Sequence, residues 1–406
     1  MDRRARAKRF VILLGWVSLF ADLCYEGMRS AIGPYLAMIG ASATAVGAVA
    51  GTGEMVGYAL RYWSGKLADR THAYWAITIS GYAVNLVAVP MLALAGSWPV
   101  VAVLVTMERL GKAIRSPAKT TLTSFAATDL GAGRAFAINE AMDQVGGLLG
   151  PLVVAGVLAW RGETPHGFAI AFVLLGVPAA ISVLVLLRAR RLYPDPRVLE
   201  DEHASTGASR LGPRYGIYLA GVALVAIGLA DWPLLAYHFG RADVVSEKWL
   251  PVVYAGAMGL DGLISLLAGL LFDRRRARGT TGAGVLAMFV IAGAAYAPLA
   301  FAASRASPYY AIGGVALWAI VHAATNSIAK AMIAAIVPRE QRGRAYGLYF
   351  LVFGIAWWAG SLLLGAVYDR SPQNAGIVAT VALTLGAAVV MWSGLGLRRP
   401  PPAAAS

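Results

Sequence analysis

Three ionisable residues near the N-terminus lie inside a long apolar stretch, where a charged group is costly. Asp22, Glu26 and Arg29 are spaced by four and three residues, so a helix places them on one face. Asp22 lies about 18 Å beyond Phe10 along a helix, close to the middle of a bilayer. A carboxyl group at that depth, with a guanidinium nearby, can load and release a proton. The alternative is a Glu26–Arg29 pair that only holds the helix in place.

A second row of charges recurs in a later apolar stretch and consists of Glu108, Arg109, Lys112, Arg115 and Lys119. At 100° per residue, these side chains fall within about a third of a helix circumference. Arg109 lies deeper in the expected membrane span than Arg115 and Lys119, so its charge requires a carboxylate partner. Its candidate partners are Glu108, Asp22, Glu140 and Asp143. We interpret Arg109 as a structural and gating residue, with direct contact to a substrate as the alternative.

Other polar and aromatic side chains complete a candidate site for a proton and a small molecule. His322, Asn326 and Lys330 recur every four residues, and a histidine titrates near neutral pH. A buried histidine that is merely hydrogen-bonded is the alternative. The predicted proton-coupling residues are Asp22, Glu26, Asp231 and His322. The predicted substrate contacts are Tyr25, Arg29, Arg109, Asp143, Trp232, Tyr237, Asn326, Lys330 and Trp357. The aromatic members could equally serve as interfacial anchors.

The elements that must position these residues are membrane-spanning helices. The 406 residues are 58% hydrophobic and 14% charged, whereas soluble domains run at about 45–50% and about 25%. Apolar windows of about twenty residues recur along the chain, and they are too long and unbroken for barrel strands. This pattern predicts an all-α, polytopic membrane protein. Its twelve expected spans are 10–38, 44–64, 75–95, 99–125, 135–160, 168–187, 215–238, 249–272, 281–302, 308–336, 345–368 and 376–395.

The basic residues are divided unevenly between the two sides of the expected membrane. The N-terminal segment holds five and the segment 188–214 holds six, whereas the whole opposite side holds five. This excess predicts that both termini of a multi-pass cell-membrane protein are cytoplasmic. The same distribution indicates that the net charge of +14 reflects the orientation of the chain in a lipid bilayer rather than a nucleic-acid partner.

Two short motifs occur twice at nearly the same separation. Gly65-Lys66-Leu67-Ala68-Asp69-Arg70 follows the second span as a charged turn, and residues 269–276 follow the eighth, 204 residues later. Residues 133–137 and 343–347 open the fifth and eleventh spans at an offset of 210. The repeat predicts two six-helix halves. The predicted domains are 1–190, a cytoplasmic linker at 191–214, a second half at 215–399 and a tail at 400–406.

Over essentially its full length, the chain resembles the major facilitator superfamily. The 65–70 motif is similar to that family's signature between spans 2 and 3, although Thr71-His72-Ala73-Tyr74 replaces the usual basic continuation. Arg109-Leu110-Gly111-Lys112 is similar to the family's span-4 pattern, and residues 146–151 to an element frequent in its antiporter branches. The resemblance implies a monomer with twelve helices, alternating access, and one substrate site at mid-membrane between the halves.

The repeated motif also predicts contacts that change during transport. Asp69 would face the start of the eleventh span near Arg344, where a helix N-terminus favours an anion. Asp273 would face the start of the fifth span near Arg134 in the same way. A static, solvated pair of loops is the alternative. The predicted gating residues are Gly65, Asp69, Arg70, Arg134, Gly150, Pro151, Gly269, Asp273, Arg274 and Arg344.

Four of the expected spans carry no ionisable side chain. The third, sixth, ninth and twelfth contain no Asp, Glu, Lys, Arg or His. Charges at membrane depth usually face a bundle interior or a water-filled cavity. We therefore expect these four spans to be peripheral and to face lipid, an arrangement that the resemblance also implies.

Signatures of catalysis and cofactor binding are missing from the sequence. There is no phosphate loop for ATP, and no Cys/His cluster has metal-ligand spacing. Uphill transport would therefore use an ion gradient, with protons expected and sodium as the alternative. We predict a secondary transporter, not an enzyme, without cofactor or metal, that exports a small organic molecule in exchange for protons. The alternatives are a proton-coupled importer of a small organic anion and, in another class, a non-transporting membrane sensor or assembly factor.

Overall fold

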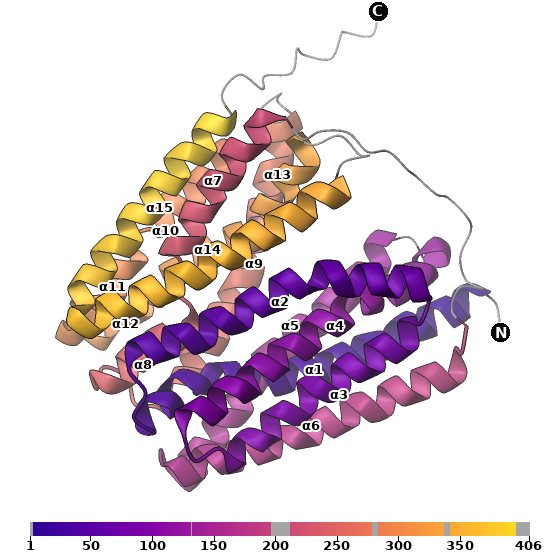
Figure 1. Cartoon of the computed structure of the whole chain (residues 1–406), viewed down its shortest axis with the longest axis horizontal. Coiled ribbons are helices and arrows are strands. Elements are labelled where there is room, and N and C mark those ends of the chain that lie inside the picture. Colours follow the sequence, from indigo (N-terminus) through magenta and orange to yellow (C-terminus); the bar gives the residue numbers. More distant parts are fainter. Residues whose placement is uncertain (1–2, 131, 196–211, 278–282, 337–341, 395–406) are drawn as a thin grey trace, which may run out of the picture. The chain divides into compact units, whose positions relative to one another are not determined.

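Every regular element in the described part of the chain is helical (Figure 1). The computed structural model describes residues 3–130, 132–195, 212–277, 283–336 and 342–394. The helices up to residue 192 are α1 (Arg3–Met38), α2 (Ala43–Thr71), α3 (Tyr74–Met91), the short η1 (Leu92–Leu94), α4 (Trp98–Leu130), α5 (Ala132–Arg161) and α6 (Pro165–Leu192). Those that follow are α7 (Pro213–Gly228), α8 (Trp232–Arg241), α9 (Leu250–Ala277), α10 (Ala283–Gly293), α11 (Tyr296–Phe301), η3 (Ala303–Ala306), α12 (Pro308–Asn326), α13 (Ile328–Ile336), α14 (Arg342–Arg370) and α15 (Pro372–Gly394).

Side-chain caps explain where several helices begin. Ser42 accepts a hydrogen bond from the backbone N–H of Ala45 at 3.1 Å and opens α2. Thr164 accepts from the N–H of Gly167 at 3.1 Å and opens α6, with proline in the first turn. Such caps satisfy N–H groups that have no partner within the helix.

The charged motif at 65–70 is helical, which corrects the expectation of a turn directly after residue 64. α2 continues through it to Thr71 and ends at His72, whose φ of 54° is left-handed. The Thr71 hydroxyl donates to the carbonyl of Leu67 at 2.8 Å, and Leu67 and Ala68 are good helix formers. The equivalent segment after the eighth expected span is likewise part of α9, which extends to Ala277.

The seventh expected span is two helices rather than one. α7 ends at Gly228, and α8 begins at Trp232 with Pro233 as its second residue. Pro233 has no N–H for the carbonyl of Leu229, so an uninterrupted helix would lose that hydrogen bond. Proline is well tolerated in the first turn of a new helix, which is where it lies.

The chain divides into two compact units, and one of the boundaries between them in the sequence falls at this break. Unit 1 comprises Met1–Ala204 and Trp232–Gly256, and unit 2 comprises Ser205–Asp231 and Ala257–Ser406. α8 and the first turns of α9 therefore belong with α1–α6. Within unit 1, α1 packs against α5, α6 and α8, while α4 packs against α2 and α3. Within unit 2, α7 packs against α14 and α15, and α10 against α12 and α15.

Glycines set the close approach of α1 and α5. A Cβ atom added at Gly146 would lie 2.2 Å from the carbonyl oxygen of Leu19, and one at Gly150 would lie 2.2 Å from that of Leu23. Pro151 is buried inside α5, which continues past it to Arg161. Small residues at this spacing let two membrane helices come close enough for backbone contact.

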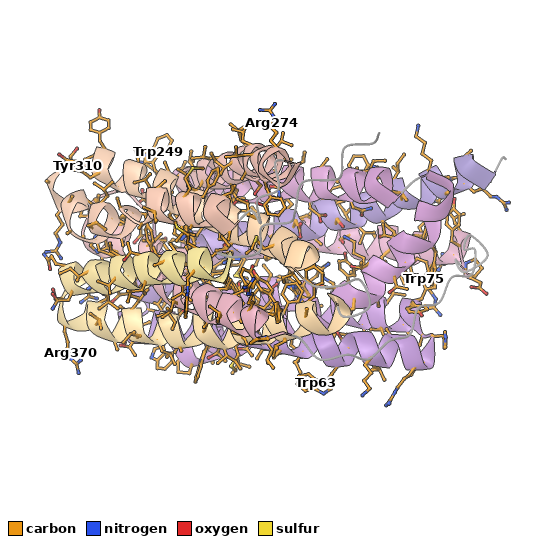
Figure 2. All side chains as sticks on the ribbon, turned by 90° about the horizontal axis from the view of Figure 1, so that it is seen from above. Trp63, Trp75, Trp249, Arg274, Tyr310 and Arg370 are labelled. Atoms are coloured by element: carbon orange, nitrogen blue, oxygen red, sulfur yellow. The ribbon has the colours of Figure 1, made fainter. Side chains whose placement is uncertain are left out.

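The outer surfaces of the two units are apolar in the way a bilayer requires. Ten helical segments of the described residues are long and apolar enough to cross a membrane. α2 and α4 have 29 and 33 residues but are less apolar, because they carry the buried charges. The expected spans without ionisable side chains lie in α3, α6, α10 and α15, and they expose large apolar side chains such as Val87, Val177, Ile291 and Ile377. Figure 2 shows Arg274, Tyr310 and Arg370 pointing away from the ribbon.

Candidate functional site

Glu54 on α2 is the centre of a buried group of charges in unit 1. Its Oε1 atom lies 3.3 Å from a guanidinium nitrogen of Arg29 on α1 and 3.2 Å from one of Arg109 on α4. All three residues are buried, with Arg109 only 6% exposed. Gly53 makes room for Arg109, since a Cβ there would lie 3.0 Å from the Cγ atom of Arg109. One carboxylate therefore joins arginines from two other helices.

Glu108 provides the second carboxylate for Arg109. Its Oε2 atom lies 3.3 Å from the Nε atom of Arg109. Asn85 on α3 donates its amide to the Oε1 atom of Glu108 at 2.6 Å and to the Glu108 carbonyl at 2.9 Å. Among the described residues, neither Glu54 Oε1 nor Glu108 Oε2 receives a hydrogen bond with good geometry. Both oxygens nevertheless face guanidinium groups at ion-pair distance.

Glu26 connects α1 to the start of α9. Tyr254 donates its hydroxyl to the Oε2 atom of Glu26 at 2.6 Å. The ring of Tyr254 packs on that of Trp232, with centroids 4.8 Å apart, and Trp232 donates to the carbonyl of Ser30 at 3.2 Å. Tyr254 and Trp232 thereby attach the segment Trp232–Gly256 to α1 through one carboxylate and one backbone carbonyl.

Tyr25 lies between bases of α4. The Lys112 ammonium is 3.5 Å and the Arg109 guanidinium 5.3 Å from the centre of its ring. Both distances are within the range of cation–π attraction. We call Glu26, Arg29, Glu54, Glu108, Arg109 and Lys112 the ionic cluster. With every member ionised, this set is formally neutral.

Asp22 and Asp143 lie beside the ionic cluster rather than in it. Lys119 on α4 contacts Ser18 on α1 and lies 3.9 Å from Asp143 on α5. Asp22 is partly exposed and interacts electrostatically with Asp143 and Lys112. These groups form a second polar layer along α1, α4 and α5.

His322 on α12 is the centre of a polar group in unit 2. Its Nδ1 atom lies 3.1 Å from Asp261 Oδ1 on α9, and the amide of Asn326 is 3.1 Å from the same nitrogen. The ring stacks on Trp318, with centroids 4.9 Å apart. The His322–Asp261 pair thereby joins a side chain of α12 to a carboxylate of α9.

The same group supports the break between α7 and α8. Trp318 donates its indole N–H to the carbonyl of Ala230 at 2.8 Å. The Tyr296 hydroxyl accepts from the N–H of Ala230 at 2.7 Å and donates to the carbonyl of Gly228 at 2.7 Å. Asp231, at the end of this break, is only 3% exposed. Two aromatic side chains thus satisfy the backbone groups that the helix break leaves open.

The other predicted substrate contacts are dispersed. Tyr237 on α8 accepts a hydrogen bond from Arg241 at 3.2 Å. Lys330 on α13 lies 6.0 Å from the centre of the Phe350 ring, and Trp357 is buried in α14 against Phe353.

Only some of the predicted gating residues can be placed. Gly65 packs on Pro117, where a Cβ would lie 3.4 Å from the proline ring, and Arg70 and Arg274 are exposed. The side chains of Asp69, Arg134, Asp273 and Arg344, and the surroundings of Gly269, lie outside the described residues. The expected contacts between Asp69 and Arg344, and between Asp273 and Arg134, therefore stay predictions.

A loop contact that the sequence did not suggest lies beyond the helix ends. Glu163, between α5 and α6, accepts from the Ser246 hydroxyl at 2.6 Å and from the Glu247 N–H at 2.7 Å, and Lys248 lies 3.8 Å away. Burial, with the charge of Glu163, raises the pKa of Glu247 to about 7. Glu247, the acid beside Glu163, therefore tends to hold a proton at this loop junction.

Asn85 is the site residue that sequence reasoning missed most clearly. Asn85 lies in the third expected span, which has no ionisable side chain and was therefore predicted to face only lipid. An amide in the middle of an apolar run nevertheless indicates a polar contact. Among the described residues, no group of three or more His, Cys, Asp or Glu side chains could hold a metal ion.

The chain has relatives of nearly equal length. It is 38% identical over 393 residues to an uncharacterized protein of Mycobacterium tuberculosis strain H37Rv, covering 95% of this chain and 93% of that protein. It is 20% identical over 390 residues to an uncharacterized MFS-type transporter of Methanocaldococcus jannaschii, covering 94% of each. Residues 229–406 match the family model of the Major Facilitator Superfamily.

Solved transporter structures share the fold. A variant of the nucleoside transporter NupG superposes with a TM-score of 0.77 at 13% identity, covering 95% of this chain and 99% of that one. A bacterial homolog of the human lysosomal transporter Spinster, inward-facing and unoccupied, gives 0.76 at 16% identity, covering 98% and 99%. At such low identity, the likeness is one of fold.

Proposed function

We propose that this chain, a member of the Major Facilitator Superfamily, is a secondary transporter that exchanges protons for a small organic molecule by alternating access. The observation that carries the proposal is the bridging position of Glu54 between Arg29 and Arg109. Three helices meet at this carboxylate, so its protonation state changes the charge balance of all three. Such a site is what proton-coupled exchange requires, because proton and substrate must compete for the same groups.

Proton coupling in this proposal is assigned to Glu26 and Glu54. When Glu54 carries a proton, its attraction for Arg29 and Arg109 falls, and these bases can pair with other acids or with a substrate. Glu26 couples the same change to α9, because its carboxylate accepts the hydroxyl of Tyr254. The His322–Asp261 pair is a second candidate proton site, in unit 2.

Export is favoured over uptake of an organic anion by the neutrality of the ionic cluster. An importer of an organic anion could use Arg29, Arg109 and Lys330 as anion contacts, but Arg29 and Arg109 already face carboxylates. An anionic substrate would have to displace a buried carboxylate, which leaves an uncompensated charge and is costly. A cation or a neutral molecule meets no such requirement.

We propose twelve membrane crossings in two halves, with both termini cytoplasmic in the cell membrane and with a monomer as the working form. The number twelve follows if α2 and α4 cross and if α7 with α8, α10 with α11, and α12 with α13 each make one crossing. The basic residues of the N-terminal segment and of the segment 188–214 support this orientation.

A proton-release measurement tests the shared site. The purified protein is first screened by thermal shift against metabolites and drugs, since a ligand at 100 times its dissociation constant adds about 2.7 kcal/mol of stability. The compound that stabilises is then added in weakly buffered solution while pH is recorded. Wild-type protein should release protons on binding, and Glu54→Gln should bind with less release. Binding without any proton release by the wild type would contradict the shared site, and Asp369→Asn, at an exposed position, is the matched control.

A further inference from the structure

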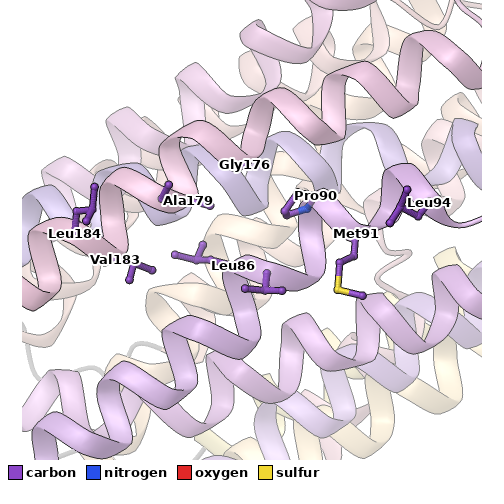
Figure 3. A pocket seen from close by; sticks show the side chains of 10 residues that line it. Leu86, Pro90, Met91, Leu94, Gly176, Ala179, Val183 and Leu184 are labelled. Atoms are coloured by element: carbon purple, nitrogen blue, oxygen red, sulfur yellow. The ribbon is translucent and has the colours of Figure 1, made fainter.

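A hollow of about 580 Å³ lies between α3 and α6 in unit 1 (Figure 3). All ten residues that line it are apolar or glycine, among them Leu86, Pro90 and Met91 on α3. Gly176 and Ala180 belong to the α6 wall. Because these two residues have little or no side chain, the wall recedes opposite the large side chains of α3.

This hollow is not part of the ionic cluster. α3 presents Asn85 to Glu108, so its polar face is turned to α4. The hollow lies along α3 and η1, where Val87 on α3 is 55% and Leu94 on η1 is 84% exposed. On α6, Leu184 is 65% exposed at the same hollow. In a membrane, the surroundings of such a face are lipid.

The hollow continues toward a basic helix end. Arg188 is exposed and follows Leu184 by four residues, about 6 Å along α6. Arg190 and Arg191 follow in the last turn of α6. The distance from Arg188 to Gly176 is about 18 Å along the helix, close to the roughly 15 Å hydrocarbon depth of one leaflet. A headgroup at Arg188 would therefore place an acyl chain along the hollow.

We propose that the hollow between α3 and α6 binds an acyl chain of an anionic phospholipid whose headgroup lies at Arg188. The apolar lining selects a hydrocarbon chain and offers no polar partner to a metabolite. The exposed guanidinium at the distance of one leaflet selects a negative headgroup over a zwitterionic one. Neither argument depends on the transport function.

Native mass spectrometry of the full-length protein in mild detergent tests the site, with phosphatidylglycerol and phosphatidylcholine of identical acyl chains as probes. The wild type should retain one phosphatidylglycerol more tightly than phosphatidylcholine. Arg188→Ala should weaken phosphatidylglycerol binding about fivefold, the factor for about 1 kcal/mol per basic residue, and leave phosphatidylcholine unchanged. Ala180→Phe fills the hollow from an exposed position and should weaken both lipids several-fold.

Matched controls are Arg274→Ala, which removes an exposed base elsewhere, and Leu385→Phe, at an apolar position on α15 that is 53% exposed. Neither should change lipid retention, and unchanged melting temperatures verify that all variants are folded. Equal retention of both lipids by the wild type would overturn the headgroup assignment. Lipid retention that Ala180→Phe leaves unchanged would overturn the acyl-chain site. A wild-type dimer that Ala180→Phe converts to monomers would also overturn it, because a second copy of the chain would then cover the hollow.

Discussion

The carboxylate of Glu54 illustrates how single residues set the character of the interior. In hydrocarbon an isolated charge is expensive, so each ionised side chain of α1, α2 and α4 needs a partner on a neighbouring helix. Glu54 meets two arginines, Arg109 meets two carboxylates, and Asn85 holds the second of these from α3. Pairing of this kind keeps the charges buried, and in the proposed mechanism a single proton rearranges them.

Removing the charge of Glu54 should be strongly destabilising. In Glu54→Gln, Arg29 and Arg109 lose their shared counter-charge while they stay buried, and breaking a buried pair costs about 3–5 kcal/mol. The free energy of unfolding of the purified protein in detergent measures the loss. Asp369→Asn, which removes an exposed acid, should cost less than about 0.5 kcal/mol. A loss below about 1 kcal/mol in Glu54→Gln would show that the bridge does not hold these helices.

Glu247 should make stability fall as pH rises from about 4.5 to about 7. Its folded pKa is raised to about 7, so between these values the folded loop holds a proton that the unfolded chain has released. The stabilisation is fully present below pH 4.5 and is lost as pH rises through the folded pKa. Melting temperatures across this range should therefore decline less in Glu247→Gln than in the wild type. Asp243→Asn, at an exposed position of the same loop, is the control, and identical pH profiles for wild type and Glu247→Gln would refute the assignment.

At the scale of elements, the apolar runs predicted the helices, and local chemistry decided their ends. Ser42 and Thr164 cap α2 and α6, and the extension of α2 to Thr71 was not predicted, because its charged motif resembles a turn in composition. The break after Gly228 was hidden for a different reason. Pro233 indicates that the helix is interrupted. Whether the chain kinks or starts a new helix there depends on Tyr296 and Trp318, which lie far away in the sequence.

The α1–α5 contact should not tolerate a methyl group at Gly146. A Cβ there would meet a backbone oxygen at 2.2 Å, which cannot move aside alone, so Gly146→Ala should cost about 1–3 kcal/mol in unfolding free energy. Gly156 on the same helix is the matched control, since nothing lies within 4 Å of a Cβ at that position. Gly156→Ala should be neutral or stabilising by up to about 1 kcal/mol. Equal effects of the two substitutions would contradict this packing.

The backbone at the α7–α8 break should depend on the Tyr296 hydroxyl. Tyr296→Phe leaves the N–H of Ala230 and the carbonyl of Gly228 without that partner, at a cost of about 1–3 kcal/mol. Thermal or chemical unfolding measures this cost. Tyr309→Phe removes a hydroxyl from a residue that is 81% exposed and should have little effect. A Tyr296→Phe variant as stable as the wild type would mean that other groups support the break.

At the scale of the whole molecule, the recurring apolar windows predicted an all-helical membrane protein, and the resemblance of the 65–70 motif and its repeat indicated the family. They were not enough to predict that Trp232–Gly256 packs with α1–α6, because that contact rests on single side chains such as Tyr254 and Trp232. Candidate site residues were recognisable wherever a charge interrupted an apolar run, as at Glu26 and Arg109. Partners that are polar but uncharged, such as Asn85, gave a weaker signal.

Proton-driven exchange in proteoliposomes tests the central claim most directly. Liposomes are prepared with the purified protein and with the compound found by thermal shift. A pH gradient is then imposed, and the flux of labelled compound is followed with and without an uncoupler. The account predicts uphill movement that collapses with the uncoupler, and a Glu26→Gln variant that still exchanges compound across the membrane but no longer moves it uphill. Flux that ignores the pH gradient, or no flux of any binding compound together with a stable partner protein on pull-down, would contradict it.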